Sequence, residues 1–371
     1  MFPYPSCTLI TACYDLHKYS PKCRTTEECL NLIDPLLQIP VYLVIYGSKT
    51  TIPGIRARRS KYDAITKYIE IELEDLWAYQ FLDQVKRNRE AYWPTRDERT
   101  CAESHIICCN KFDFVLETMS INPFNTTHFG WIDAYLGKAN ADQKALAHPK
   151  AQSASIEALA DQKANADQKA LAHPKAKSAS IEALAKASTT LRICENYTIA
   201  TIPRILRTIA DEWKSTQFHI QILNVCDKKF KDPAHKREYY NQYRWVVCGG
   251  FFVTAPDAGI SILSRLKEIF VETTQAGYGH GEEMFYLEVL DEYSEQIRGT
   301  YGDYGQILDN FIYPTRNIEY VYHTILANYK SFGYEREASK LESQLLESAN
   351  KSWVIIDDCD YKRIKGTRRS L

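Results

Sequence analysis

The chain has little that would direct it to a nucleic acid or a membrane. Its 371 residues contain 46 Lys and Arg against 47 Asp and Glu, a net charge of −1, so no excess of positive charge favours a nucleic-acid partner. The longest apolar runs, such as 41–46, are far too short to span a bilayer. The first ten residues have neither a basic segment nor a long apolar stretch. We therefore expect a globular protein of the cytoplasm.

Several common catalytic and metal-binding motifs are also missing. The eleven cysteines include no C-x-x-C pair, which excludes the usual zinc motifs and favours buried thiols in a reducing compartment. No G-x-S-x-G elbow, no G-x-x-x-x-G-K-[ST] loop and no H-E-x-x-H helix occurs. These absences exclude the α/β-hydrolase, P-loop and zincin templates.

One segment differs in kind from the rest. Residues 139–160 and 164–185 repeat each other and differ only at Gln152 and Lys177. Each copy is rich in alanine, has no aromatic residue and is interrupted by a His-Pro pair that breaks a helix. We interpret 137–189 as an insertion, natural or engineered, that forms a solvated helical or disordered spacer.

Around the insertion, apolar strand-like runs alternate with helical ones. Predicted strands cover 7–15, 41–48, 68–76, 128–134, 218–225 and 244–259, and predicted helices cover 25–37, 97–122 and 315–351. This alternation is typical of an α/β sandwich with a mainly parallel central sheet.

A lone carboxylate, Asp133, ends the apolar run "HFGWI". In an open α/β sheet, ligands bind beyond the carboxyl ends of the strands, where the strand order reverses. A carboxylate there can hold a divalent metal, which in turn holds a diphosphate. An Asx-turn or a helix cap is the commoner use of such a residue.

The stretch "GYGHGEEMFYLEVL" places Glu282 and Glu283 at the start of a predicted helix after three glycines. A carboxylate there can accept a proton from a hydroxyl, or simply offset the helix dipole. Residues adjacent in a helix lie about 100° apart, so we expect at most one of the two glutamates to face a cleft.

Three other features allow either a ligand site or an ordinary structural role. Gly249 and Gly250 interrupt a buried strand, which marks a bulge or a close approach of another chain segment. Asp303 lies in "YGDYGQ", which could face a sugar or nucleotide or form an Asx-turn. The basic run 56–61 could bind phosphate, although a solvated loop is more frequent.

Seven segments, in chain order, together resemble the HtrL/YibB-type proteins of bacteria and large DNA viruses. They are TLITACYDL, VYLVIYGS, NKFDFV, NPFNTTHFGWIDA, VVCGGFFV, HGEEMFY and YGDYGQIL, which leave out the insertion and the final helices. Such proteins look like glycosyltransferases of the GT-A fold. The resemblance implies a divalent metal, manganese or magnesium, and a nucleotide-sugar donor.

The resemblance also implies roles for residues of the first half. Asp133 would be the metal-binding acid of a D-x-D motif, although Trp131 stands where its first acid would be. Lys111 would point toward the donor phosphates. Thr11, Ala12 and Tyr14 would line the pocket for the nucleotide base.

Other implied roles concern the second half. Glu283, or else Glu282, would match the carboxylate that deprotonates the acceptor hydroxyl in an inverting enzyme. Gly249 and Gly250 would border the acceptor, with Asp303 nearby. The acceptor itself, a glycan or a protein, is not indicated.

We therefore predict a nucleotide-sugar-dependent glycosyltransferase with four regions. The donor half covers 1–136, the insertion 137–189, the acceptor half 190–314 and a helical extension with a basic tail 315–371. The main alternative is a non-catalytic protein that binds a nucleotide or sugar on the same fold. A glycoside hydrolase would need two facing carboxylates, and no such pair stands out.

Overall fold

The computed structural model describes residues 4–92, 100–136, 201–223, 236–237, 240, 246–278, 281–301, 308, 311, 326–331, 333 and 335–349. The predicted insertion at 137–189 lies outside these residues.

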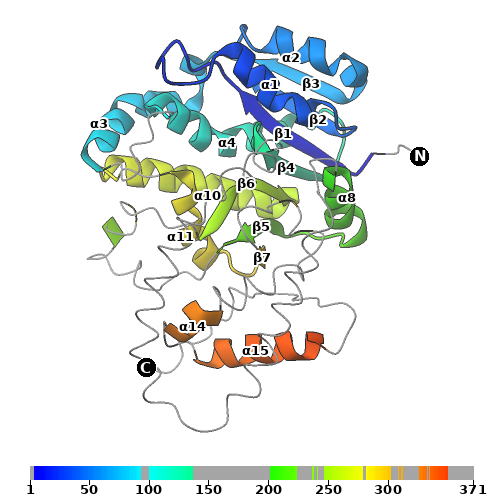
Figure 1. Cartoon of the computed structure of the whole chain (residues 1–371), viewed down its shortest axis with the longest axis vertical. Helices are drawn as coiled ribbons and strands as arrows, with labels where there is room; N and C mark the ends of the chain where they lie inside the picture. The colour runs from blue at the N-terminus through cyan, green and yellow to red at the C-terminus, as the bar shows by residue number, and fades with distance from the viewer. Residues whose placement is uncertain are drawn as a thin grey trace.

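One seven-stranded sheet forms the centre of the molecule (Figure 1). Its strand order is β3-β2-β1-β4-β6-β5-β7. The strands are β1 (Cys7–Cys13), β2 (Tyr42–Gly47), β3 (Thr66–Glu70), β4 (His128–Ile132), β5 (Phe218–Ile222), β6 (Val247–Thr254) and β7 (Ile297–Tyr301). Four of the six strand pairs are parallel, and the two that involve β6 are antiparallel. The predicted α/β class with a mainly parallel sheet is confirmed.

The direction of strand addition reverses beside β1. From β1 the chain proceeds outward to β2 and β3, and then returns through α4 (Ala102–Ile121) to β4 on the other side of β1. Because β1 and β4 are parallel, their carboxyl ends meet at the same edge. This edge is the switch point at which open α/β sheets bind ligands.

Helices cover both faces of the sheet. Helices α1 (Thr26–Leu37), α2 (Ile52–Arg59) and α8 (Ile202–Arg207) pack on one face in one hydrophobic cluster. Helices α3 (Leu82–Tyr92), α4, α10 (Pro256–Gln275) and α11 (Tyr286–Glu292) belong to the cluster on the other face. The strands between these layers are buried on both sides, and therefore β1, β4 and β6 are apolar almost throughout.

The helix predicted over 25–37 is confirmed as α1. Thr25 accepts a hydrogen bond from the Glu28 backbone, and the Glu28 side chain accepts one from the Thr25 backbone. This reciprocal capping fixes the start of α1. The stretch predicted as helical over 315–351 contains two helices, α14 (Ala327–Ser331) and α15 (Glu335–Ala349), with a turn at Gly333 between them. Figure 1 shows both helices at the end of the molecule remote from β1 to β3.

Two predicted strands end five or six residues before their predicted last residue. The strand predicted over 68–76 ends at Glu70, because Leu73 turns into the core through a 3₁₀ turn, Leu73–Asp75. The strand predicted over 244–259 ends at Thr254, and Pro256 begins α10, as proline does at the first turn of a helix.

The basic run 56–61 is helical rather than a loop. It spans the end of α2 and the start of a 3₁₀ helix, Ser60–Ile65, and its Arg59 is fully buried. Its guanidinium donates to the carbonyls of Leu37, Ile39 and Val41 and to the Thr66 hydroxyl. Burial lowers the pKa of Arg59 to about 10. Arg59 therefore supports the link between α1 and β2.

In the described part of the chain, no helix is both long and apolar enough to cross a membrane.

Candidate functional site

The switch point brings together residues from three distant segments. Asp133 follows β4 directly, and its backbone N–H donates to the Gly250 carbonyl over 2.9 Å. Because β6 runs antiparallel to β4, the beginning of β6, with Gly249 and Gly250, reaches the edge at which β4 ends. Asp133 thus lies where the sequence predicted it, at the carboxyl end of a buried strand.

Lys111 connects these segments from α4. Its ammonium donates to Glu282 Oε1 at 2.7 Å and to the Gly249 carbonyl at 3.0 Å, and lies 3.6 Å from Asp133 Oδ1. Burial alone would lower the pKa of Lys111, but Asp133 and Glu282 raise it well above its usual value. Lys111 is therefore a permanent positive charge held between two carboxylates.

The predicted orientation of Lys111 needs correction. The residue is 1% exposed, and its ammonium is directed at protein oxygens rather than outward to donor phosphates. The pattern of apolar and polar residues along α4 could not predict these contacts. The partners of Lys111 lie in other segments: after β4, in β6 and after residue 280.

Both glutamates contact the same glycine. Glu282 and Glu283 lie in a 3₁₀ turn, Glu282–Met284, and Glu283 Oε1 accepts the Gly249 N–H over 3.2 Å. A Cβ at Gly249 would lie 3.1 Å from Glu282 Oε1 and 3.4 Å from Glu283 Cγ. The bare backbone of Gly249 thus admits both glutamates. The expectation that at most one of them faces a cleft stays a prediction.

The Asp133 carboxylate has a partner that the sequence analysis did not identify. Trp131 Nε1 donates to Asp133 Oδ1 over 2.6 Å. Residues two apart in a strand share a face, so the indole can reach the carboxylate. The two-residue spacing of Trp131 and Asp133 is the sequence feature from which this contact could have been predicted. The Asp133 side chain is 47% exposed, and among the described residues its Oδ2 has no hydrogen-bond partner.

The three residues predicted to line a base pocket do not share a face. Ala12 and Tyr14 belong to the core on the α4 side, whereas Thr11 points to the opposite side of β1. Thr11 is fully buried, and neither its hydroxyl nor that of Tyr14 has a hydrogen-bond partner within the described residues. Side chains of Thr11 and Ala12 therefore cannot line one pocket together. Only Ala12 and Tyr14 lie on the face that carries Lys111.

Gly250 lies against the Asp133 carboxylate. A Cβ at this position would come within 3.2 Å of Asp133 Oδ2, so a side chain here would crowd that oxygen. The role of Gly249 and Gly250 beside an acceptor stays a prediction. Asp303 lies outside the described residues.

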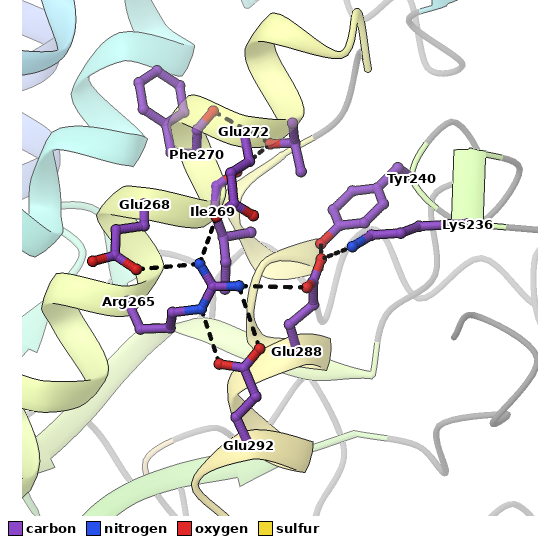
Figure 2. A network of polar contacts seen from close by, with 10 residues as sticks. Lys236, Tyr240, Arg265, Glu268, Ile269, Phe270, Glu272, Glu288 and Glu292 are labelled. Carbon is purple, nitrogen blue, oxygen red and sulfur yellow. Dashed lines mark hydrogen bonds and ion pairs between the residues drawn. The ribbon is translucent and has the colours of Figure 1, made fainter. Parts of the chain in front are cut away.

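A charged network anchors the helix that follows the glutamates (Figure 2). Arg265 of α10 donates to both oxygens of Glu292 on α11, at 2.9 and 3.3 Å, and to Glu272 at 2.8 Å. Glu288 of α11 lies 3.9 Å from Arg265 and 2.9 Å from Lys236. Because α11 begins three residues after Glu283, this network helps to fix where both glutamates lie.

One protein family and one solved structure are similar to parts of this chain. The model of a family described as "Bacterial protein of unknown function (HtrL_YibB)" matches residues 5–153. No curated protein matches the chain. Among solved structures, mouse xyloside xylosyltransferase 1 in its apo form is similar with a TM-score of 0.35 and 10% identity, over 79% of this chain and 84% of that one. The resemblance to HtrL/YibB-type proteins is thus confirmed over residues 5–153, which contain β1 to β4 and Asp133.

Proposed function

We propose that this protein transfers a sugar from a nucleotide-sugar donor to a hydroxyl group of an acceptor, assisted by divalent manganese or magnesium. One observation carries the proposal. Three carboxylates and a buried lysine, from three segments of the chain, converge on Gly249 and Gly250 at the switch point of the sheet. Charged groups that perturb one another are candidates for a functional site, and open α/β sheets bind ligands at this edge.

The site offers few protein ligands to a metal ion. Asp133 offers one oxygen, Oδ2, because Oδ1 is engaged by Trp131. Within the described ranges, no group of three His, Cys, Asp or Glu could enclose a metal ion. Magnesium is commonly held by one or two carboxylates together with phosphate oxygens and water. The donor set therefore fits a metal that binds together with a diphosphate, held by Asp133. Such a metal would neutralise the charge of the leaving diphosphate.

For the acceptor we favour Glu283 as the general base. Glu282 Oε1 is held by the Lys111 ammonium at 2.7 Å, and Glu283 is the residue that the resemblance to HtrL/YibB-type proteins matches to the base. In the proposed step, the acceptor oxygen attacks the anomeric carbon, its proton passes to Glu283, and the nucleoside diphosphate leaves. This displacement inverts the anomeric centre.

The alternative is a protein that binds a nucleotide or sugar without transferring it. A panel of UDP-, GDP-, CDP- and ADP-sugars, each with and without Mn²⁺, separates the two. We expect one donor class to raise the melting temperature and to release nucleoside diphosphate when Mn²⁺ is present. A metal-dependent stabilisation without any release, with a range of sugar and peptide acceptors, would favour the binding protein. No stabilisation by any donor would refute both.

A further inference from the structure

We propose that Trp131 is a positioning residue that orients Asp133 toward the metal–diphosphate complex. The inference rests on the proposed function and adds a residue to it. Its basis is the 2.6 Å hydrogen bond from the Trp131 indole N–H to Asp133 Oδ1, the shorter of the two polar contacts of that carboxylate.

The indole is fixed by its surroundings. Trp131 is 3% exposed, and its ring lies parallel to that of Phe114, at 8° and 6.2 Å between centroids. The Lys111 ammonium lies 5.5 Å from the centre of the same ring. A ring held by a strand, an aromatic neighbour and a cation has little freedom to turn, so the direction of its N–H is set by the fold.

This rigid donor determines which oxygen remains for a ligand. With Oδ1 engaged by Trp131 and facing Lys111, Asp133 can present Oδ2 alone, on a side chain that is 47% exposed. A carboxylate with one free oxygen binds a metal through one bond and depends on the diphosphate for the others. Groups that orient a metal ligand by hydrogen bonding typically contribute 10–100-fold to metal affinity.

The test compares Trp131→Phe with wild type by the Mn²⁺ concentration that gives half of the maximal thermal shift. Each titration contains saturating ADP, CDP, GDP or UDP, whichever stabilises wild type most. We expect the half-saturating Mn²⁺ concentration to rise by about 10–100-fold in Trp131→Phe, with the maximal shift retained at high metal. Replacing Trp131 by benzothienylalanine removes the N–H at constant ring shape, and should give the same rise if Trp131→Phe does not fold.

Trp77→Phe is the matched control. The Trp77 ring also packs in the core on the α4 side, 5.8 Å from Phe270, and lies under the Lys267 ammonium at 4.2 Å. It should lose stability without changing the Mn²⁺ titration. An equal rise in Trp77→Phe would overturn the inference, because the effect would then follow stability alone.

Two further outcomes separate this inference from the proposed function. If Asp133→Asn abolishes the metal-dependent shift while both Trp131 variants titrate as wild type does, the positioning role is wrong and the proposed metal site stands. If wild type shows no Mn²⁺-dependent stabilisation by any of the four diphosphates, both are overturned.

Discussion

Lys111 is the positive charge toward which Asp133 and Glu282 are both oriented. Replacing it by methionine keeps most of the side-chain volume but leaves two carboxylates and the Gly249 carbonyl without their cation. Breaking a buried ion pair in this way costs roughly 3–5 kcal/mol. Asp133 is half exposed, so water offsets part of the loss, and we expect Lys111→Met to lower the unfolding free energy by about 2–3 kcal/mol.

Urea unfolding at pH 7 measures this difference. The control is Lys330→Met, which removes an exposed pair with Glu342 and should cost under about 1 kcal/mol. If Lys111→Met and Lys330→Met lose the same unfolding free energy, Lys111 does not stabilise the protein more than an exposed ion pair does, and this interpretation is wrong.

The position of Asp133 could be predicted from the sequence, because a buried strand ending in one carboxylate is a local pattern. The partners of Lys111 could not, since they depend on how α4 lies over two strands that follow it in the chain. The predicted base pocket was wrong in one respect, because Thr11 and Ala12 lie on opposite faces of β1. The alternation of Thr11 and Ala12 was visible in the sequence, yet the resemblance assigned both residues the same role.

At the scale of elements, α10 and α11 hold the glutamate turn in place through Arg265. Its guanidinium forms a two-pronged pair with Glu292 and further contacts with Glu272, Glu268 and Glu288. Arg265→Met would leave these acids without their shared cation. The acids other than Glu288 are well exposed, so we expect a loss of only about 1–2 kcal/mol in unfolding free energy.

The sharper consequence of Arg265→Met should be kinetic. If α11 positions the turn that carries Glu283, donor binding should stay near that of wild type. The rate of transfer should fall by up to about 100-fold, the cost of misplacing a catalytic group by about 1 Å. Arg265→Lys keeps the charge but loses the fork, so an intermediate rate is expected. A rate unaffected by either substitution would remove the network from the account of the site.

Most strands and α1 were predictable because their signals are local: apolar runs between polar turns, and a Thr–Glu cap. Helices α2 and α10 were missed for different reasons. The first looked like a charged loop because Arg59 is buried only by tertiary contacts. The second follows β6 after a single residue, so the strand was predicted to continue through Pro256 to residue 259 instead of giving way to a helix.

At the scale of the whole molecule, two buried histidines predict sensitivity to acid. Burial, with smaller effects of Arg89 on one and of Arg298 and His128 on the other, lowers the pKa of His105 and of His219 to about 3. An unfolded histidine titrates near 6.5, so the unfolded chain binds more protons between about pH 6.5 and 3. Stability contributed by the neutral rings is therefore complete above pH 6.5 and falls as the pH drops toward 3.

His219→Phe tests this contribution. The ring stacks on Trp213 at 5.5 Å, and neither nitrogen has a hydrogen-bond partner within the described residues, so phenylalanine can take its place. The unfolded variant lacks one histidine and so binds one proton fewer than unfolded wild type at acidic pH. Between pH 6 and 4, its unfolding free energy should therefore fall less than that of wild type, by at most about 1.4 kcal/mol per pH unit. Denaturant midpoints at pH 8, 6 and 4 measure it. Parallel pH profiles of variant and wild type would contradict the assignment.

The central claim is that the carboxylates at the switch point carry out sugar transfer, and the rate of transfer by Glu283→Gln tests it most directly. With the donor identified by the nucleotide-sugar panel and an acceptor that supports turnover, Glu283→Gln should transfer about 10²–10⁴-fold more slowly than wild type. Donor affinity should stay close to that of wild type, because the lost interaction acts on the acceptor. Glu282→Gln, which loses its ion pair with Lys111, should retain clearly more activity. Transfer at the wild-type rate by both variants would contradict the account.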